Sequence, residues 1–363
     1  MRKAVKVGIV LLLFLGLTAG VFAGGPPGGE KPAGQVTYKK AIEYPAPVPI
    51  EAQAGFGNLK YVKGKVPTIA YMPPATEFNY YIAIGEGIKA LAKETGANTF
   101  MLAPQSGADI NGQMGMIQDV MTRGVDAIIL STHDENAAAP LVKQAVDAGV
   151  AVIIVNSDIR NFPTAVHGVV GYSQRGGTHN LGLYAAGRAQ GVAKVGVLEG
   201  LPGYHSTERI GGFLDAFATF PKMEVVATLS TEWNVETGYS SMTDMLQAHP
   251  EIQIVVAAND YEAIGAARAA REQGREDVLI YGNDGDTTGL EDIAAGTWTA
   301  TVNTTPFVMG QVALQVTIDC LNGVYPGGWV ETPTVVVDKS NVLDYLCQPE
   351  KLYPPVAGTY DCP

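Results

Sequence analysis

Short apolar runs alternate with longer amphipathic stretches through most of this chain. The runs at 68–72, 127–130 and 254–257 are rich in Val, Ile and Ala, as buried parallel strands are. The stretch at 79–95 carries Ile and Leu at helical spacing and is followed by Gly96, a residue type that commonly ends a helix. The pattern therefore predicts an α/β fold made of repeated β-α-β units.

The predicted elements fall into two successive series that meet near Gly171. The expected strands are 68–72, 98–102, 127–130, 150–155, 194–198, 224–229, 254–257, 278–281 and 299–303. The expected helices are 79–95, 110–123, 137–148, 174–190, 207–220, 235–248, 261–273, 287–295 and 306–321. This order predicts two doubly wound lobes, each with its own parallel sheet.

The same pattern divides the chain into segments. We expect a leader at 1–23, a Pro- and Gly-rich arm at 24–65, a first lobe at 66–171 with 305–323, a second lobe at 172–304 with 324–346, and a tail at 347–363. The arm lacks periodicity and is expected to be an extended linker.

The leader has the three parts of a secretory signal peptide. Arg2, Lys3 and Lys6 precede an apolar run at 7–17, and the small residues around Ala23 fit a cleavage site. The run is short for a bilayer span, so an uncleaved membrane anchor is the weaker alternative. No Cys follows the run, so a lipid anchor is not expected. The leader predicts an exported protein with a periplasmic or other extracytoplasmic location.

Composition supports a large buried core and argues against one class of partner. Hydrophobic residues make up 47% of the sequence and charged residues 17%, which fits buried parallel strands. With 24 basic and 36 acidic residues, the formal net charge is −12. Because phosphate binding needs clustered Lys and Arg, nucleic acid is not expected as a partner.

Polar side chains stand where several predicted strands end. Asn156, Asp158, Asn259 and Asp284 each follow a strand closely, and the carboxyl ends of strands are where open α/β sheets bind ligands. Their oxygens and amides can bond ligand hydroxyls. The alternative is that each one caps the next helix or shapes a turn, and this is the role expected for Asp260.

Arg209 stands near the start of a predicted helix, where a cation opposes the helix dipole. A purely structural role is therefore disfavoured. Its five donors in a fixed fork suit a pair of ligand hydroxyls or a ring oxygen. A solvated surface arginine is the alternative.

Several phrases of the chain, taken together, resemble a known family. They lie at 78–81, 120–128, 209–213, 258–260, 282–285 and 332–337. In this order and spacing the chain resembles the type 1 periplasmic sugar-binding proteins of ABC transporters, the ribose- and galactose-binding group, over about 66–344. The resemblance implies two Rossmann-like lobes with parallel sheets, a hinge of three crossings and a sugar enclosed between the lobes. We expect the crossings near 171–172, 303–306 and 323–328.

The resemblance also implies roles for further residues. Tyr80, Tyr81 and Trp233 stand where the family stacks rings on the apolar faces of a sugar, and Thr304 where it places a polar contact. Adjacent helix residues cannot face the same way, so one of the two tyrosines could belong to the core. The expected ligand-binding set is Tyr80, Tyr81, Asn156, Asp158, Arg209, Trp233, Asn259, Asp284 and Thr304.

Two departures from the family pattern leave the identity of the ligand open. Asn156-Ser157-Asp158 stands where the sugar binders usually carry Asp-Arg or a similar pair. Pro73-Pro74 stands where the first strand usually ends in Ser or Asn.

Motifs for catalysis, metals and cofactors are missing from the sequence. There is no HExxH, P-loop, GxGxxG or CxxC, and Gly171-Tyr172-Ser173 lacks the second glycine of a nucleophile elbow. We therefore expect neither an enzyme nor a cofactor or metal. Among the three cysteines, Cys347 and Cys362 are the leading candidates for a disulfide, with Cys320 left as a buried thiol.

The sequence predicts an exported receptor for a small polyhydroxylated ligand, with a monosaccharide favoured. The expected partner is an ABC transporter permease, a chemoreceptor is a further candidate, and a monomer is expected. A polyol, a nucleoside or a furanosyl signal molecule is the alternative ligand. A ligand-regulated repressor is the alternative of another class, but it needs a DNA-binding headpiece where a leader and an arm stand. A secreted hydrolase would need the missing nucleophile motif.

The leader makes a direct prediction. Exported protein should begin at about Gly24, because the small residues around Ala23 form the cleavage site. Intact-mass spectrometry of the exported protein measures this. Recovery of the protein with Met1 and the apolar run still attached would contradict the prediction.

Overall fold

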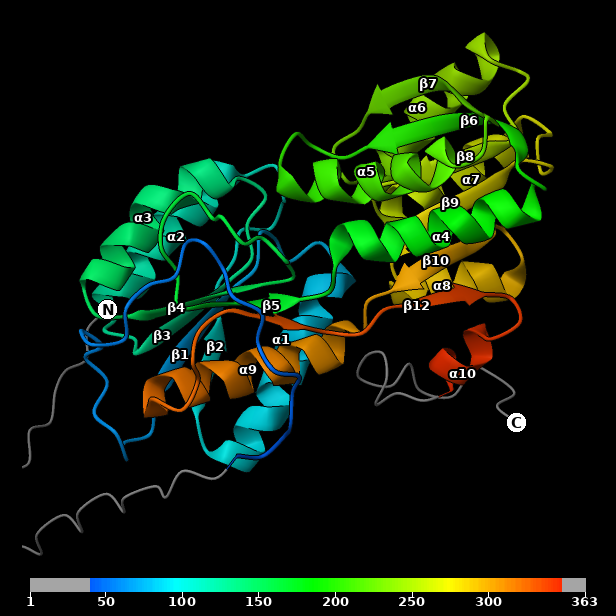
Figure 1. The fold of residues 1–363 in the computed structure, drawn as a ribbon. Coiled ribbons are helices and arrows are strands. Elements are labelled where there is room, and N and C mark those ends of the chain that lie inside the picture. Colours follow the sequence, from blue (N-terminus) through cyan, green and yellow to red (C-terminus); the bar gives the residue numbers. More distant parts are fainter. Residues whose placement is uncertain (1–39, 348–363) are drawn as a thin grey trace, which may run out of the picture. The chain divides into compact units, whose positions relative to one another are not determined.

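The computed structural model describes residues 40–347, which form two α/β lobes with six-stranded sheets (Figure 1). The first sheet runs in the order β11 (Trp329–Glu331), β5 (Gly168–Gly171), β4 (Ala151–Val155), β3 (Ala127–Leu130), β1 (Thr68–Met72) and β2 (Asn98–Met101). The second runs in the order β12 (Val335–Asp338), β10 (Ala300–Asn303), β9 (Leu279–Asp284), β8 (Ile254–Ala257), β6 (Val192–Glu199) and β7 (Lys222–Ser230). Neighbouring strands are parallel except for the antiparallel pair β10–β12.

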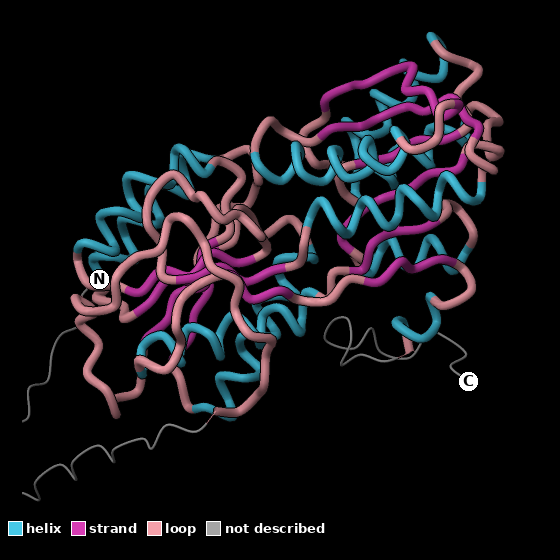
Figure 2. Tube along the Cα trace, viewed as in Figure 1, coloured by secondary structure: helices cyan, strands magenta, loops and turns pink. Residues whose placement is uncertain are grey.

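Helices lie on both faces of each sheet (Figure 2). Those of the first lobe are α1 (Asn79–Thr95), α2 (Ile110–Thr122), α3 (Glu135–Asp147) and α9 (Pro306–Asn322). Those of the second lobe are α4 (Gln174–Arg188), α5 (Tyr204–Ala218), α6 (Val235–Ala248), α7 (Asp260–Glu272), α8 (Thr287–Ala295) and α10 (Val342–Leu346). Within residues 40–347, no helix combines the length and apolar character that a membrane span requires.

The strands read as continuous apolar runs because both of their faces are covered. In β1, Ile69 and Tyr71 pack into a cluster with α1 and α9. Ala70 and Met72, which point the opposite way, pack into a second cluster with α2 and α3. The α/β fold with two parallel-sheet lobes, predicted from this pattern, is confirmed.

The third crossing between the lobes does not lie at 323–328, where it was predicted. β11 pairs with β5 in the first sheet, so the chain crosses between β11 and β12, after residue 331. Residues 324–331 therefore belong with the first lobe and not with the second. Gly327 and Gly328 have φ values of 92° and 109°, which form a turn into β11 instead of a hinge. The apolar pattern predicted neither β5, which has 4 residues, nor β11, which has 3.

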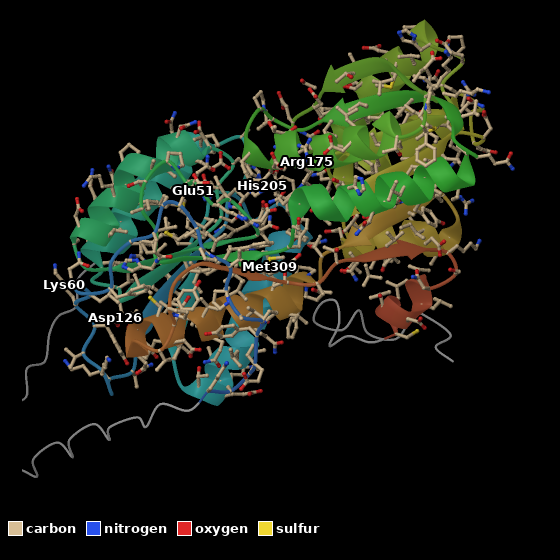
Figure 3. All side chains as sticks on the ribbon, viewed as in Figure 1. Glu51, Lys60, Asp126, Arg175, His205 and Met309 are labelled. Atoms are coloured by element: carbon tan, nitrogen blue, oxygen red, sulfur yellow. The ribbon has the colours of Figure 1, made fainter. Side chains whose placement is uncertain are left out.

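The part of the predicted linker that the structure describes, 40–65, is packed along the first lobe. We call residues 40–60 the strap. Within it, Val48 forms an antiparallel bridge with Trp329 at the edge strand β11. The backbone N–H groups of Glu51 and Lys60, both labelled in Figure 3, donate to carbonyls of the first lobe at 2.7 and 2.9 Å. The lack of apolar periodicity led to the wrong prediction of an extended linker, because an edge strand can hold a segment by backbone hydrogen bonds alone.

The strap also binds α9 through buried polar groups. Gln315 Oε1 accepts from the backbone N–H groups of Ala41 and Ile42 at 3.0 and 3.3 Å. The hydroxyl of Tyr44 donates to Asp319 Oδ2 at 2.6 Å, and Gln315 Nε2 donates to the other oxygen of Asp319 at 2.7 Å. These contacts satisfy two polar side chains that α9 would otherwise bury without partners.

The predicted leader at 1–23 and the proposed disulfide partner Cys362 lie outside the described residues, so both stay predictions. Cys320, on α9, is buried and free.

Two glycines set the position of α1, the helix that carries Tyr80 and Tyr81. A Cβ added at Gly87 of α1 would lie 2.0 Å from the carbonyl oxygen of Phe307. A Cβ added at Gly310 of α9 would lie 2.0 Å from the carbonyl oxygen of Ile84. The backbones of the two helices therefore approach more closely than any side chain allows.

Gly87→Ala should destabilise the protein by about 1–3 kcal/mol, because the added methyl meets backbone and not a movable side chain. The matched control is Gly115→Ala in α2, where no atom lies within 4 Å of the new methyl. It should stabilise the protein by about 1 kcal/mol through helix propensity. Urea unfolding of both variants measures the difference. Equal effects of the two substitutions would show that the α1–α9 contact is not tight.

Candidate functional site

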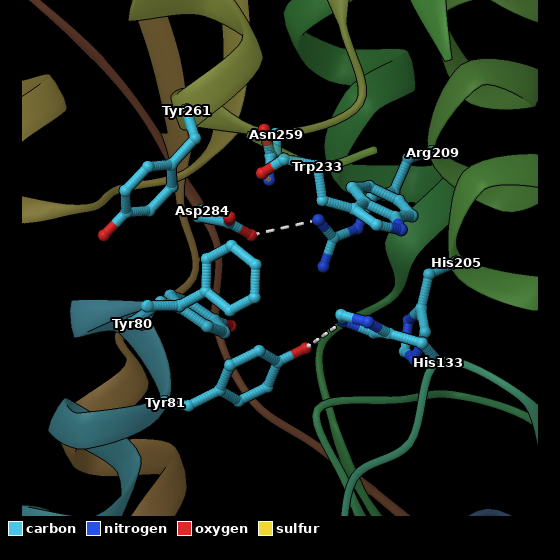
Figure 4. A pocket seen from close by; sticks show the side chains of 10 residues that line it. Tyr80, Tyr81, His133, His205, Arg209, Trp233, Asn259, Tyr261 and Asp284 are labelled. Atoms are coloured by element: carbon cyan, nitrogen blue, oxygen red, sulfur yellow. Dashed lines mark hydrogen bonds and ion pairs between the residues drawn. The ribbon is translucent and has the colours of Figure 1, made fainter. Parts of the chain in front are cut away.

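A pocket lies between the lobes, where the carboxyl ends of strands from both sheets meet. Figure 4 shows the side chains that line it. The first lobe contributes Phe78, Tyr80, Tyr81 and His133, and the second contributes His205, Arg209, Trp233, Asn259, Tyr261 and Asp284. Six of the predicted ligand-binding residues, at 80, 81, 209, 233, 259 and 284, thus line one pocket.

An ion pair between Arg209 and Asp284 forms the polar wall of the pocket. Arg209 Nη1 lies 3.0 Å from Asp284 Oδ1, and both side chains are buried. Arg209 also donates from Nε to Gln174 Oε1 at 2.9 Å and from Nη1 to the Ala258 carbonyl at 3.1 Å. These contacts leave Nη2 without a hydrogen bond to any described residue, and Figure 4 shows the guanidinium pointing into the pocket.

Asp284 is held in an environment that disfavours its charge. Burial raises the pKa of its carboxyl to about 7, although Arg209 beside it acts in the opposite direction. Its Oδ1 also accepts from Asn283 Nδ2 at 3.2 Å, while Oδ2 has no hydrogen bond to a described residue. A ligand hydroxyl that donates to this oxygen would favour the ionised form.

Three of the predicted site residues have a backbone conformation that costs free energy. Asn156, Trp233 and Asp284 have φ values of 62°, 66° and 143°, a range that residues other than glycine rarely adopt. Such conformations cost about 1–3 kcal/mol each and persist only where surrounding contacts enforce them. Their concentration around one pocket is typical of a functional site.

Asn156 and Thr304 lie behind the pocket and not in its lining. The hydroxyl of Tyr80 donates to Asn156 Oδ1 at 2.8 Å and lies 2.7 Å from Thr304 Oγ1. Asn156 Nδ2 donates to the hydroxyl of Tyr81 at 3.5 Å. Both polar residues are fully buried and fix the two tyrosine rings that do line the pocket.

Asp158 lies outside the lining as well, at a contact between the lobes. Its Oδ1 accepts from the hydroxyl of Tyr204 at 3.1 Å, and its Oδ2 accepts from the N–H of Gln174 at 3.1 Å. Burial raises the pKa of Asp158 to about 6. The structure thus gives Asp158 partners within the protein, one of them on α5.

The helix cap predicted for Asp260 is made by its neighbour Asn259. Asn259 is the N-cap of α7, because its Oδ1 accepts from the N–H of Glu262 at 2.8 Å. Its Nδ2 donates to the Trp233 carbonyl at 3.0 Å, so one amide hydrogen remains for the pocket. The prediction that Asp260 caps the helix is wrong. Asp260 instead accepts from the N–H groups of Gly285 and Asp286 at 2.9 and 2.8 Å. It therefore fixes the loop that follows Asp284.

Four lining residues were missed by the sequence-based prediction: Phe78, His133, His205 and Tyr261. His133 follows β3, so the strand-end rule that singled out Asn156 would have found it. His205 stands four residues before Arg209 on α5, and this proximity is its only signal in the sequence. Phe78 and Tyr261 touch across the lobes, with ring centroids 5.4 Å apart, and only the closed pocket reveals this.

The two histidines of the pocket are uncharged rings. Burial lowers the pKa of His133 to about 4 and the pKa of His205 well below its usual value. His205 Nδ1 lies 2.6 Å from Gln174 Nε2, an amide nitrogen that can only donate, so the ring proton is on Nε2. Within the described part of the chain, no group of three or more His, Cys, Asp or Glu could hold a metal ion.

Glu262 supports the ion pair indirectly, through Ala258. Its side chain accepts from the N–H of Ala258 at 2.9 Å and from the hydroxyl of Thr231. It thereby holds Ala258, the residue whose carbonyl accepts from Arg209. Glu262 is fully buried, and burial raises the pKa of its carboxyl to about 8.

Known proteins are similar to this chain over most of its length. The periplasmic binding protein domain family matches residues 69–324. The ribose import binding protein RbsB of Bacillus subtilis (strain 168) is 29% identical over 323 residues, covering 89% of this chain and 94% of its own length. The D-ribose/D-allose-binding protein of Pseudomonas aeruginosa is 30% identical over 286 residues, covering 75% of this chain and 88% of its own.

A solved structure shows the same likeness in three dimensions. The periplasmic solute-binding protein of an ABC transporter from Actinobacillus succinogenes 130z, solved with bound D-allose, is 26% identical with a TM-score of 0.71. The match covers 77% of this chain and all of that one. These relatives are binding proteins, not enzymes.

The raised pKa of Glu262 predicts a pH dependence of stability. The folded protein holds a proton on Glu262 up to about pH 8, whereas the unfolded chain loses it near pH 4.5. The stability due to this proton is complete below pH 4.5 and is lost as the pH rises toward 8, by up to about 1.4 kcal/mol per pH unit. Glu262→Gln, which mimics the protonated acid, should reduce the slope by the share of one proton. The buried carboxyls of Asp284 and Asp158, whose pKa values are raised to about 7 and about 6, keep the rest.

Thermal unfolding of wild type and variant between pH 5 and pH 9 measures the difference between their slopes, which should be roughly one proton per molecule. The matched control is Glu272→Gln on the same helix, an exposed residue whose pKa is lowered by hydrogen bonds from Tyr239 and Arg268. It should leave the slope in this range in place. A wild-type slope that persists in Glu262→Gln would contradict the prediction.

Proposed function

The chain belongs to the periplasmic binding protein family, and from that premise we propose that it is an exported receptor for a monosaccharide. It captures the sugar in the pocket between the lobes and delivers it to the permease of an ABC transporter. The observation that carries this proposal is the buried pair Arg209–Asp284, which keeps free hydrogen-bonding atoms inside a pocket lined by aromatic rings.

The chemistry of the pocket suits a sugar. Arg209 offers donors on Nη2, Asp284 offers an acceptor on Oδ2, and Asn259 offers one amide hydrogen. Hydroxyl groups donate and accept, so they can pair with all three. The C–H faces of a sugar ring are apolar, and rings such as those of Tyr81 and Trp233 can cover them. The relatives support the same ligand class, since their names include ribose, allose and apiose.

Contacts across the pocket support capture by closure. The hydroxyl of Tyr261 in the second lobe accepts from the N–H of Asn79 in the first lobe at 3.1 Å. The ring of His133 in the first lobe stacks on Trp233 in the second, with centroids 5.9 Å apart. These contacts belong to a closed state, which an enclosed ligand would stabilise. The closed receptor presents a surface that a permease can recognise.

The location and the remaining partners rest on the sequence. We infer that the leader exports the protein to the periplasm or its equivalent, without a lipid anchor. We infer that the receptor acts as a monomer with the permease as its main partner, and that a chemoreceptor is a second candidate for the closed surface.

A thermal-shift screen of the purified mature protein against pentoses, hexoses, polyols and nucleosides tests the proposal. A ligand at 100 times its Kd adds about 2.7 kcal/mol of stability, which is a clear shift. Asp284→Asn should weaken binding of the sugar so identified at least tenfold, because a neutral amide cannot replace the charged acceptor beside Arg209.

The control is Asp244→Asn, an exposed carboxylate on α6 of the same lobe. Its affinity in calorimetry should equal that of the wild type. A screen in which no sugar shifts the transition would overturn the proposed function. Normal sugar binding by Asp284→Asn would overturn the role of the ion pair.

A further inference from the structure

The two walls of the pocket differ in kind. Every lining residue from the first lobe is a ring: Phe78, Tyr80, Tyr81 and His133. The two residues of the ion pair in the lining, Arg209 and Asp284, both come from the second lobe. A ligand held between the walls therefore meets the ion pair on one side only. On the other side it meets rings alone, while Trp233, Tyr261 and His205 add rings to the side of the ion pair.

The polar atom of Tyr80 is already occupied within the first wall. Its hydroxyl lies between Asn156 Oδ1, at 2.8 Å, and Thr304 Oγ1, at 2.7 Å. Both partners are fully buried, and Tyr80 itself is 2% exposed. A phenol hydroxyl has one proton, and here it is given to Asn156. The ring and not the hydroxyl is the part of Tyr80 that a ligand can touch.

The remaining polar atoms of this wall are also directed to one another. The hydroxyl of Tyr81 lies 3.4 Å from His133 Nε2 and 3.5 Å from Asn156 Nδ2. His133 Nδ1 lies 3.2 Å from the Gly107 carbonyl. The Tyr81 hydroxyl has longer hydrogen bonds than the Tyr80 hydroxyl. Tyr81 is therefore the residue of this wall whose substitution gives the clearest test.

The rings of the first wall also pack against one another. The centroids of Phe78 and Tyr81 are 5.9 Å apart and those of Tyr80 and Tyr81 are 5.4 Å apart, both with the edge of one ring toward the other. His133 continues this surface, with its centroid 6.1 Å from that of Phe78. Such a surface favours C–H groups and offers no strong hydrogen bond.

The second wall provides the free hydrogen-bonding atoms. Arg209 Nη2, Asp284 Oδ2 and one amide hydrogen of Asn259 carry no hydrogen bond to a described residue. They lie on one side of the pocket in Figure 4, above the two tyrosines. They can satisfy a short row of hydroxyls along one edge of a ligand.

We propose that the receptor is specific for a deoxy sugar, a monosaccharide in which an edge carries a methyl or methylene group instead of a hydroxyl. The hydroxylated edge binds Arg209, Asp284 and Asn259, and the deoxy edge packs against the rings of Phe78, Tyr80 and Tyr81. A hydroxyl turned toward that wall loses its water and finds no partner, which weakens binding about tenfold. This inference rests on the proposed sugar-binding function and names the kind of sugar.

Calorimetry on matched pairs tests it with the full mature protein. The pairs are D-galactose with D-fucose, L-mannose with L-rhamnose, and D-ribose with its 2-deoxy and 5-deoxy forms. Each pair differs by a single hydroxyl. In the pair that binds most tightly, the deoxy member should bind at least tenfold more tightly than its hydroxylated partner. A hydroxylated member that binds equally or more tightly would overturn the proposal.

Tyr81→Phe provides the second measurement. It removes the only loosely held hydroxyl of the first wall, so the ratio of affinities, deoxy over hydroxylated, should stay the same or rise. A fall in this ratio, or a tenfold loss of affinity for the deoxy sugar, would show that Tyr81 bonds a ligand hydroxyl and would refute the proposal.

The failures of the two proposals are distinguishable. If sugars bind but the hydroxylated member is preferred, the specificity inference fails and the receptor function stands. If no member of any pair binds, and no sugar of the wider screen does, both fail together.

Discussion

The ion pair of Arg209 and Asp284 is the interaction on which the rest of the site depends. Separating the pair from water is costly, and the structure offsets this cost with further hydrogen bonds. Gln174 and the Ala258 carbonyl hold the guanidinium, and Glu262 holds the Ala258 peptide in turn. The supporting groups come from α4, from the residue that follows β8, and from α7, so the pair depends on three segments of the second lobe. Its atoms without a hydrogen bond to a described residue, Arg209 Nη2 and Asp284 Oδ2, are then available to a ligand in the pocket.

The apolar wall is built by a different principle. Its tyrosines would each bring a hydroxyl into the cleft, but Asn156 and Thr304 draw the Tyr80 hydroxyl back into the protein. Thr304 follows β10 at a crossing between the lobes. The ring surface therefore depends on a residue that belongs to the hinge, and its geometry is set where the lobes are joined.

Periodicity was enough to predict the two lobes and most helix bounds, because both signals are local in the chain. The strand-end rule and the resemblance likewise brought Arg209, Asp284 and Trp233 to one pocket. The sequence could not show that Asn156 and Thr304 lie behind Tyr80. That arrangement depends on hydrogen bonds between residues 76 and 224 positions apart. It also could not separate Asn259 from Asp260, since both residue types cap helices and only the backbone decides which one does.

The strap has a consequence for the order in which this protein can fold. The first sheet is complete only when β11, near the end of the chain, has paired with β5, and the strap from the beginning of the chain then pairs with β11. Every strand of the second sheet except β12 comes from one continuous stretch, 192–303. Pairings that are close in sequence form faster than distant ones. The lobe that carries Arg209 and Asp284 can therefore form most of its sheet from one local stretch of the chain, whereas the first sheet has to wait for residue 331.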